Sequence, residues 1–76
     1  MKIQILGMGC AKCVKLTRVA EEAARELGLQ YELEKITDAN RFMEFGVLMT
    51  PALAIDGVVK CSGKIPSVED AKKMLA

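Results

Sequence analysis

The pattern of hydrophobic and polar residues predicts a series of short strands and helices along the 76-residue chain. Apolar and polar residues alternate over residues 2–6, which predicts a strand that stops at Gly7. From residue 11 to residue 27 apolar residues recur at helical spacing, and Gly28 is suited to the position after the last turn. Residues 31–36 have mixed polarity, as expected for a strand near the edge of a sheet. The first half of the chain therefore predicts a strand, a helix and a second strand.

The second half of the chain predicts a short helix, a hairpin and a last helix. Thr37-Asp38 can cap a helix that runs through residue 45. Asp56-Gly57 is the strongest two-residue hairpin signal in the sequence, and Ser67 is a suitable N-cap for the last helix. The remaining elements are strands at residues 52–55 and 58–61 and a helix at residues 68–75.

This order of elements predicts an α/β fold. A helix joins the first two strands, so these strands should be parallel, with a right-handed crossover between them. The hairpin adds two antiparallel strands, and three helices are available to flank the resulting four-stranded mixed sheet. Because 76 residues are too few for two cores, we expect residues 1–76 to form a single domain.

Composition and charge exclude several classes of function. Eleven basic residues stand against ten acidic ones, and one Tyr, two Phe and no Trp offer few rings for stacking on bases, so we expect no nucleic-acid partner. The apolar runs are far shorter than the roughly 18 residues needed to cross a bilayer. The N-terminus lacks the features of a signal peptide. We therefore expect a cytoplasmic protein without a membrane partner.

Three cysteines and no histidine indicate sulfur chemistry. An odd number of cysteines cannot form a fully paired secreted disulfide framework, which again favours a reducing cytoplasm. Cys10 and Cys13 form a Cys-x-x-Cys pair where the first strand gives way to the first helix. The start of a helix favours a thiolate at Cys10, and Lys12 adds positive charge nearby. Cys13, three residues later, is close enough to resolve a mixed disulfide formed at Cys10.

These motifs resemble the thioredoxin-like superfamily, in particular its small redox-active disulfide proteins. The Cys-x-x-Cys pair follows the first strand, Thr50-Pro51 leads into the third, and the resemblance covers essentially the whole chain. It implies a thioredoxin-like βαβαββα fold and a thiol–disulfide oxidoreductase with Cys10 as nucleophile and Cys13 as resolving thiol. It also implies a cis peptide bond before Pro51 and a backbone contact from Thr50 to a substrate peptide.

The same resemblance implies that the Cys10–Cys13 disulfide is itself the redox group, with no separate cofactor and no metal. The expected partners are a disulfide-bearing protein or a small-thiol substrate, together with an external reductase. Ala11-Lys12 is neither the Gly-Pro of thioredoxins nor the Pro-Tyr of many glutaredoxins. Ser62-Gly63 stands where glutaredoxins have the Gly-Gly that helps them hold glutathione, which argues against glutathione as the substrate.

The third thiol, Cys61, ends the second strand of the hairpin. That strand should run parallel to the first one, with Cys61 at the same edge of the sheet as Cys10 and about two strand spacings, roughly 10 Å, away. This separation is too large for a direct disulfide. A structural role is therefore favoured for Cys61, and a secondary redox or metal-binding role is the alternative.

Two other functions remain open from the sequence. Gly7-Met8-Gly9-Cys10 also resembles the loop of heavy-metal-associated domains and copper chaperones, whose paired thiolates suit Cu(I). Those domains need the order βαββαβ, whereas this chain predicts a helix after its second strand and another at its end, so the order favours redox chemistry. A non-catalytic thioredoxin-like binding module is the remaining hypothesis.

Overall fold

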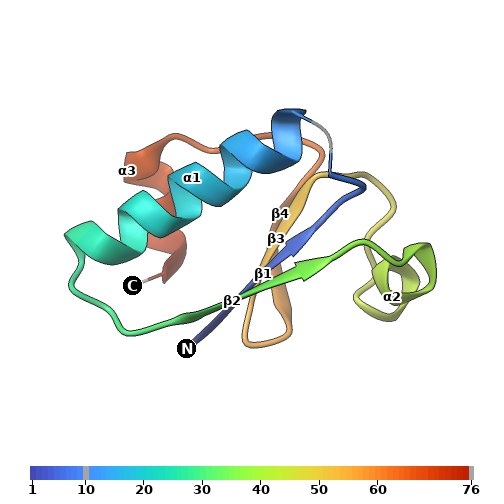
Figure 1. Ribbon diagram of the computed structural model, residues 1–76, viewed down its shortest axis with the longest axis horizontal. Coiled ribbons are helices and arrows are strands. Elements are labelled where there is room, and N and C mark those ends of the chain that lie inside the picture. Colours follow the sequence, from blue (N-terminus) through green and yellow to red (C-terminus); the bar gives the residue numbers. More distant parts are fainter. Residues whose placement is uncertain (10, 76) are drawn as a thin grey trace.

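The computed structural model describes residues 1–9 and 11–75, and within them it shows an α/β fold with one four-stranded sheet and three helices (Figure 1). The strands lie in the order β2-β1-β3-β4. The chain follows the order βαβαββα that its sequence predicts, and not the βαββαβ order of the copper-chaperone fold. The elements are β1 (Lys2–Leu6), α1 (Ala11–Glu26), β2 (Glu32–Ile36), α2 (Ala39–Glu44), β3 (Ala52–Ile55), β4 (Val58–Ser62) and α3 (Val68–Leu75).

The pairing of the strands confirms the predicted mixed sheet. β1 is parallel to β2 and antiparallel to β3, which in turn is antiparallel to β4. The turn between β3 and β4 has φ values of 50° at Asp56 and 86° at Gly57. Two successive residues with positive φ are what a tight two-residue hairpin requires. β4 extends one residue beyond its predicted end because Ser62 still pairs with Ala52.

An irregularity in the ladder between β3 and β4 sets the orientation of Cys61. Ala54 pairs with Val59, but the next pair joins Leu53 to Cys61, so Lys60 has no partner on β3. An extra residue of this kind is a β-bulge, and it shifts by one the residues that face each side of the sheet. Cys61 therefore faces the same side as Leu53.

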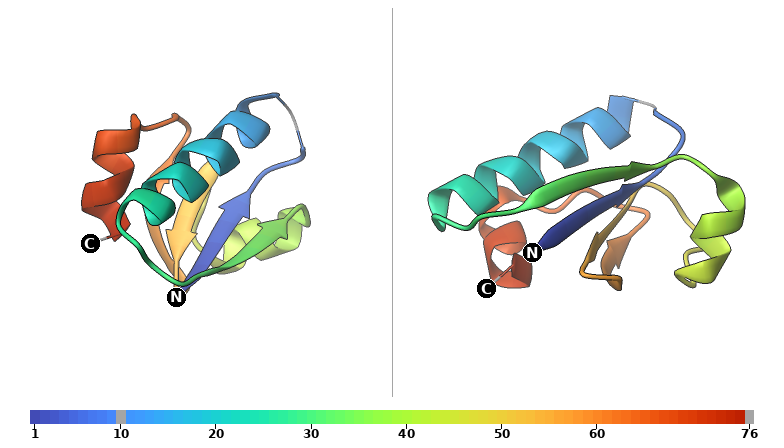
Figure 2. Two further views of the ribbon diagram at one scale, coloured as in Figure 1. Left: turned by 60° about the vertical axis from the view of Figure 1, so that its left-hand side comes forward. Right: turned by 60° about the horizontal axis from the view of Figure 1, so that its bottom comes forward.

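The two faces of the sheet are covered differently (Figure 2). α1 and α3 pack against each other over one face, whereas α2 covers only one end of the other face. The core under α1 and α3 is built mainly on Ile3, Ile5, Leu16, Ala20, Leu53, Ile55, Ala71 and Leu75. The smaller core under α2 consists of Leu6, Ile36, Phe42, Val47, Ala52 and Ala54.

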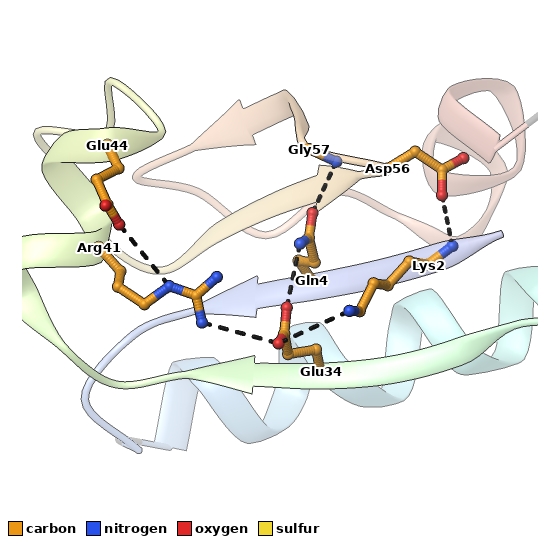
Figure 3. A network of polar contacts seen from close by, with 7 residues as sticks. All are labelled: Lys2, Gln4, Glu34, Arg41, Glu44, Asp56 and Gly57. Atoms are coloured by element: carbon orange, nitrogen blue, oxygen red, sulfur yellow. Dashed lines mark hydrogen bonds and ion pairs between the residues drawn. The ribbon is translucent and has the colours of Figure 1, made fainter.

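Beyond α2, the second face of the sheet carries a network of polar contacts (Figure 3). The side chain of Gln4, which is 6% exposed, donates to Glu34 Oε1 at 3.1 Å and accepts the N–H of Gly57 at 2.8 Å. Glu34 also forms ion pairs with Lys2 and Arg41. The hydrogen bond from Gln4, more than these two charges, lowers the pKa of Glu34. A buried amide with both polar atoms satisfied thus joins β1, β2 and the hairpin turn.

Local sequence signals explain where the helices begin and end. Asp38 caps α2 and Ser67 caps α3, each by accepting a backbone N–H from the first turn of the helix. Gly28 follows α1 with a φ of 69°, a conformation that glycine adopts easily. α1 and α2 each end one residue before their predicted ends, at Glu26 and Glu44. Of the helices in the described residues, none has the length and apolar character needed to cross a membrane.

Candidate functional site

The candidate site lies where β1 ends and α1 begins. Cys13 is the third residue of α1, and its side chain is largely buried, with the residue 6% exposed. A Cβ atom added to Gly7 would collide with the sulfur of Cys13, so this sulfur packs directly against the Gly7 backbone. The same added atom would lie 3.8 Å from the Cα atom of Pro51. The fold therefore brings together Gly7, Cys13 and Pro51, which are distant in the sequence.

The loop that ends in Pro51 forms a second wall of the site. The peptide bond between Thr50 and Pro51 is cis, which is the geometry that the family resemblance implies. Pro51 is buried and Thr50 is exposed. The carbonyl oxygen of Pro51 accepts the N–H of Gly63 at 2.9 Å, and the side chain of Met49 lies against Gly63. The loops before β3 and after β4 are thus joined beside Cys13.

Cys10, the predicted nucleophile, lies outside the described residues, so its role stays a prediction. The predicted effect of Lys12 on Cys10 stays a prediction for the same reason. Lys12 itself is exposed on α1, and the first turn of this helix contains no acidic residue. The start of α1 therefore carries positive side-chain charge in addition to the positive end of the helix dipole.

A small cavity lies beside Cys13, between α1 and the end of β2. Its volume is about 50 Å³. The residues that line it include Ile5, Gly7, Cys13, Thr17, Lys35 and Thr37. A larger open hollow of about 410 Å³, which Met1 and Asp56 help to line, occupies the opposite end of the sheet, and none of the described residues that line it is a cysteine. The smaller cavity is therefore the one that lies beside the Cys13 thiol.

Two features of this site, the packing of Gly7 against Cys13 and the position of Lys35, were not predicted from the sequence. The sequence pattern interprets Gly7 as the end of a strand and as part of the loop that resembles copper chaperones, and it interprets Lys35 only as a polar residue of an edge strand. The structure pairs Lys35 with Ile5, which faces α1, and paired residues on neighbouring strands point to the same side of a sheet. The alternation in residues 31–36 could have indicated this face, but only once the register with the first strand was known.

Cys61 lies in the core under α1 and α3 and is not among the residues that line the small cavity. It is 8% exposed and forms no disulfide. Burial raises the pKa of the Cys61 thiol, while a hydrogen bond with the Leu53 backbone and the charge of Lys64 oppose this rise. Thiolate formation at Cys61 is therefore unfavourable, and its role in the protein stays a prediction.

The loops next to the site expose large apolar side chains. Met8, in the loop after β1, is 69% exposed. Leu48 and Met49, which come directly before Thr50, are 95% and 64% exposed. Exposed apolar side chains in loops beside a site can contact a binding partner, and methionine adapts easily to different partners. We call Met8, Leu48 and Met49 the apolar rim.

Comparison with known proteins gives one family and several relatives. A family model described as thioredoxin domain matches residues 1–76. A protein named thioredoxin from Methanothermobacter thermautotrophicus is 46% identical over 76 residues, which cover 100% of this chain and 99% of the relative. A protein of the same name from Methanocaldococcus jannaschii is 44% identical over 73 residues, which cover 96% of this chain and 84% of the relative. The family model and the Methanothermobacter relative cover all the strands and helices described above.

Proposed function

Because the chain belongs to the thioredoxin domain family, we propose that it is a small thiol–disulfide oxidoreductase that reduces disulfides through Cys10 and Cys13. The Cys10 thiolate attacks one sulfur of the substrate disulfide, so that a mixed disulfide forms and the other substrate sulfur leaves as a thiolate. Cys13 then attacks the sulfur of Cys10 and releases the second substrate thiolate. Two electrons from an external reductase reopen the resulting Cys10–Cys13 disulfide.

The environment of Cys13 is the observation that carries this proposal. Cys13 lies in the first turn of α1, where the helix dipole favours negative charge, and its sulfur packs against Gly7. The residue is 6% exposed, so a protein substrate has little access to this sulfur. A thiol that is hard to reach from outside but lies at a helix start suits the resolving role rather than the attacking one.

The substrate is proposed to bind beside Pro51. Thr50 is exposed and precedes the buried proline, so its backbone is available to pair with an extended segment of a partner. The apolar rim can contact apolar side chains of the same partner. We therefore propose a disulfide-bearing protein as the substrate, with a small disulfide as the simpler alternative.

Several further parts of the proposal follow from the same chemistry. Lys12 favours the Cys10 thiolate through its positive charge. The Cys10–Cys13 disulfide is the redox group, so the reaction needs no separate cofactor and no metal. Cys61 has a structural role. The proposed location is the cytoplasm, where thiols are ordinarily kept reduced.

Substitution of single cysteines tests the assignment. Incubated with a disulfide protein such as insulin, Cys13→Ser should accumulate a covalent adduct, because the mixed disulfide forms but is not resolved. Cys10→Ser should form no adduct and should not reduce the substrate. Non-reducing electrophoresis and mass spectrometry detect the adduct, and dithiothreitol-driven insulin reduction measures turnover.

The control for this experiment is Cys61→Ser, which should retain turnover. Full turnover in Cys10→Ser would overturn the assignment, and an adduct located at Cys61 would transfer the nucleophilic role to that thiol. A wild-type chain that is inert toward disulfides would instead support a non-catalytic binding module.

A further inference from the structure

The turn between β3 and β4 contains a dipeptide that can undergo a reaction of its own. Asp56-Gly57 is the one place in the sequence where a glycine follows an aspartate or an asparagine. In such a pair the backbone nitrogen of the glycine can attack the side-chain carboxyl of the aspartate, because glycine has no Cβ atom to hinder the approach. Both residues are exposed to water. The turn is therefore a potential site of aspartate isomerisation.

This isomerisation exchanges only water with the surroundings. The Gly57 nitrogen loses its proton and bonds to Cγ of Asp56, while one carboxyl oxygen leaves as water and a cyclic succinimide forms. Water then opens the ring. Opening at Cγ restores aspartate, whereas opening at the former backbone carbonyl gives isoaspartate, in which the main chain runs through the side chain. The main chain is then one carbon longer, which a tight two-residue turn does not accommodate.

Contacts from β1 hold both reacting groups of the turn (Figure 3). The N–H of Gly57 donates to Oε1 of Gln4 at 2.8 Å. Oδ1 of Asp56 accepts the backbone N–H of Lys2 at 2.7 Å, which restricts rotation of the carboxyl. The Gly57 nitrogen must turn toward Cγ and release its proton before it can attack, and an amide oxygen is too weak a base to take that proton. The hydrogen bond to Gln4 therefore opposes the reaction.

The side chain of Gln4 is fixed from its other end as well. The residue is 6% exposed, and its Nε2 donates to Glu34 Oε1 at 3.1 Å, so the amide oxygen is directed toward Gly57. Glu34 is itself held by two ion pairs. A buried amide that is bonded at both ends cannot rotate without leaving polar atoms unpaired. The acceptor for the Gly57 N–H is thus held in place by the whole network.

We propose that Gln4 protects the hairpin turn, and that Asp56 is a latent isomerisation site which stays closed while Gln4 holds the Gly57 N–H. This role does not depend on the chemistry proposed for the cysteines. It accounts for a buried polar side chain between Ile3 and Ile5, which both belong to the apolar core. Once the contact is lost, through unfolding or substitution, the turn reacts and isoaspartate remains as a covalent product.

Ageing of the folded chain at mildly acidic pH tests the proposal. An endoproteinase that cuts before aspartate does not cut before isoaspartate, so loss of cleavage at residue 56 measures the product. Asp38 and Asp70, each followed by alanine, are standards in the same digest. Gln4→Met removes the acceptor at similar side-chain size and should accelerate the loss about tenfold. The wild-type chain unfolded in urea should react at least as fast as Gln4→Met.

Glu34→Gln is the matched control, because its amide oxygen can still accept the Gln4 N–H while both ion pairs are lost. Cys61→Ala, which changes the core and leaves the turn intact, controls for lower stability. Both should isomerise within about twofold of the wild-type rate. Amide hydrogen exchange should show the Gly57 N–H unprotected in Gln4→Met and protected in Glu34→Gln.

Three results would overturn the proposal. Gln4→Met could age at the wild-type rate, or one of the controls could react as fast as Gln4→Met. In either case the hydrogen bond of Gly57 would not be what limits the reaction. Folded wild type could also react as fast as the urea-unfolded chain, and this comparison needs no variant to fold.

Discussion

Cys13 and Cys61 are buried to nearly the same extent, 6% and 8% exposed, but their surroundings differ. Cys61 is enclosed by apolar residues of the core under α1 and α3, where burial raises the pKa of its thiol. Cys13 lies at the start of a helix, against Gly7 and beside a cavity that Lys35 lines. Burial alone therefore does not determine what a thiol can do; the charges and dipoles within its reach do.

The largest effect is expected when the space beside Cys13 is filled. Gly7→Ala adds a methyl group where the sulfur of Cys13 lies, so either the sulfur or the start of α1 must move. We expect a loss of about 1–3 kcal/mol in the free energy of unfolding and a fall in turnover of more than about tenfold. Urea unfolding and insulin reduction measure the two effects.

Gly46→Ala separates this collision from backbone strain. Gly46 has a φ of 76°, but a Cβ atom at this position would meet no other atom within 4 Å. The substitution should cost about 1–2 kcal/mol through strain alone and leave turnover unchanged. If the two glycine variants lost turnover equally, close packing of Gly7 against Cys13 would not explain the result.

Removal of the Cys61 thiol should lower stability and leave turnover nearly unchanged. Cys61→Ala leaves a small cavity in the core and should lower the free energy of unfolding by about 1 kcal/mol, while turnover stays within about twofold of wild type. Cys61→Val, which restores the lost volume, should recover most of that stability. A large drop in turnover in a folded Cys61→Ala protein would show that the two thiols are not as different as their surroundings suggest.

The smallest effect concerns the dependence of stability on pH. Because burial raises the pKa of Cys61 above its ordinary value of 9.0, the unfolded chain loses this proton at a lower pH than the folded chain does. The stability that this thiol contributes is thus fully present below pH 9.0 and is lost as the pH rises through the higher folded value. Wild type should therefore lose more stability than Cys61→Ala in urea unfolding at alkaline pH. Identical pH profiles for the two proteins would contradict this account.

The order of elements could be predicted because short-range signals determine it. Asp56-Gly57 specifies a tight turn whatever strands surround it, and Asp38 and Ser67 begin helices through contacts within their own first turns. The end of β4 was less predictable, because Ser62 belongs to the strand only through its pairing with Ala52. Local chemistry thus predicts which elements form, while the partner strand determines where some of them stop.

The candidate site was only partly predictable for the same reason. Cys13 and Pro51 belong to short motifs that can be recognised in the sequence. The importance of Gly7 depends on where the sulfur of Cys13 lies, and the position of Lys35 depends on the pairing of β2 with β1. Both the packing of Gly7 against Cys13 and the pairing of β2 with β1 are tertiary contacts, so the local sequence around Gly7 or Lys35 does not reveal them.

The bulge at Lys60 has a consequence for how the chain can diverge. Side chains along a strand point alternately to the two faces of the sheet. One extra residue therefore moves every later side chain of that strand to the opposite face. Because Lys60 is left out of the ladder, Cys61 shares a layer with Leu53; if Lys60 paired with Leu53 instead, Cys61 would be aligned with Ala52 in the layer of α2. A change at this edge that removed the bulge while keeping Lys60 in the ladder would therefore relocate the third sulfur without altering any letter of the Cys-x-x-Cys motif, whereas deletion of Lys60 would leave Cys61 opposite Leu53.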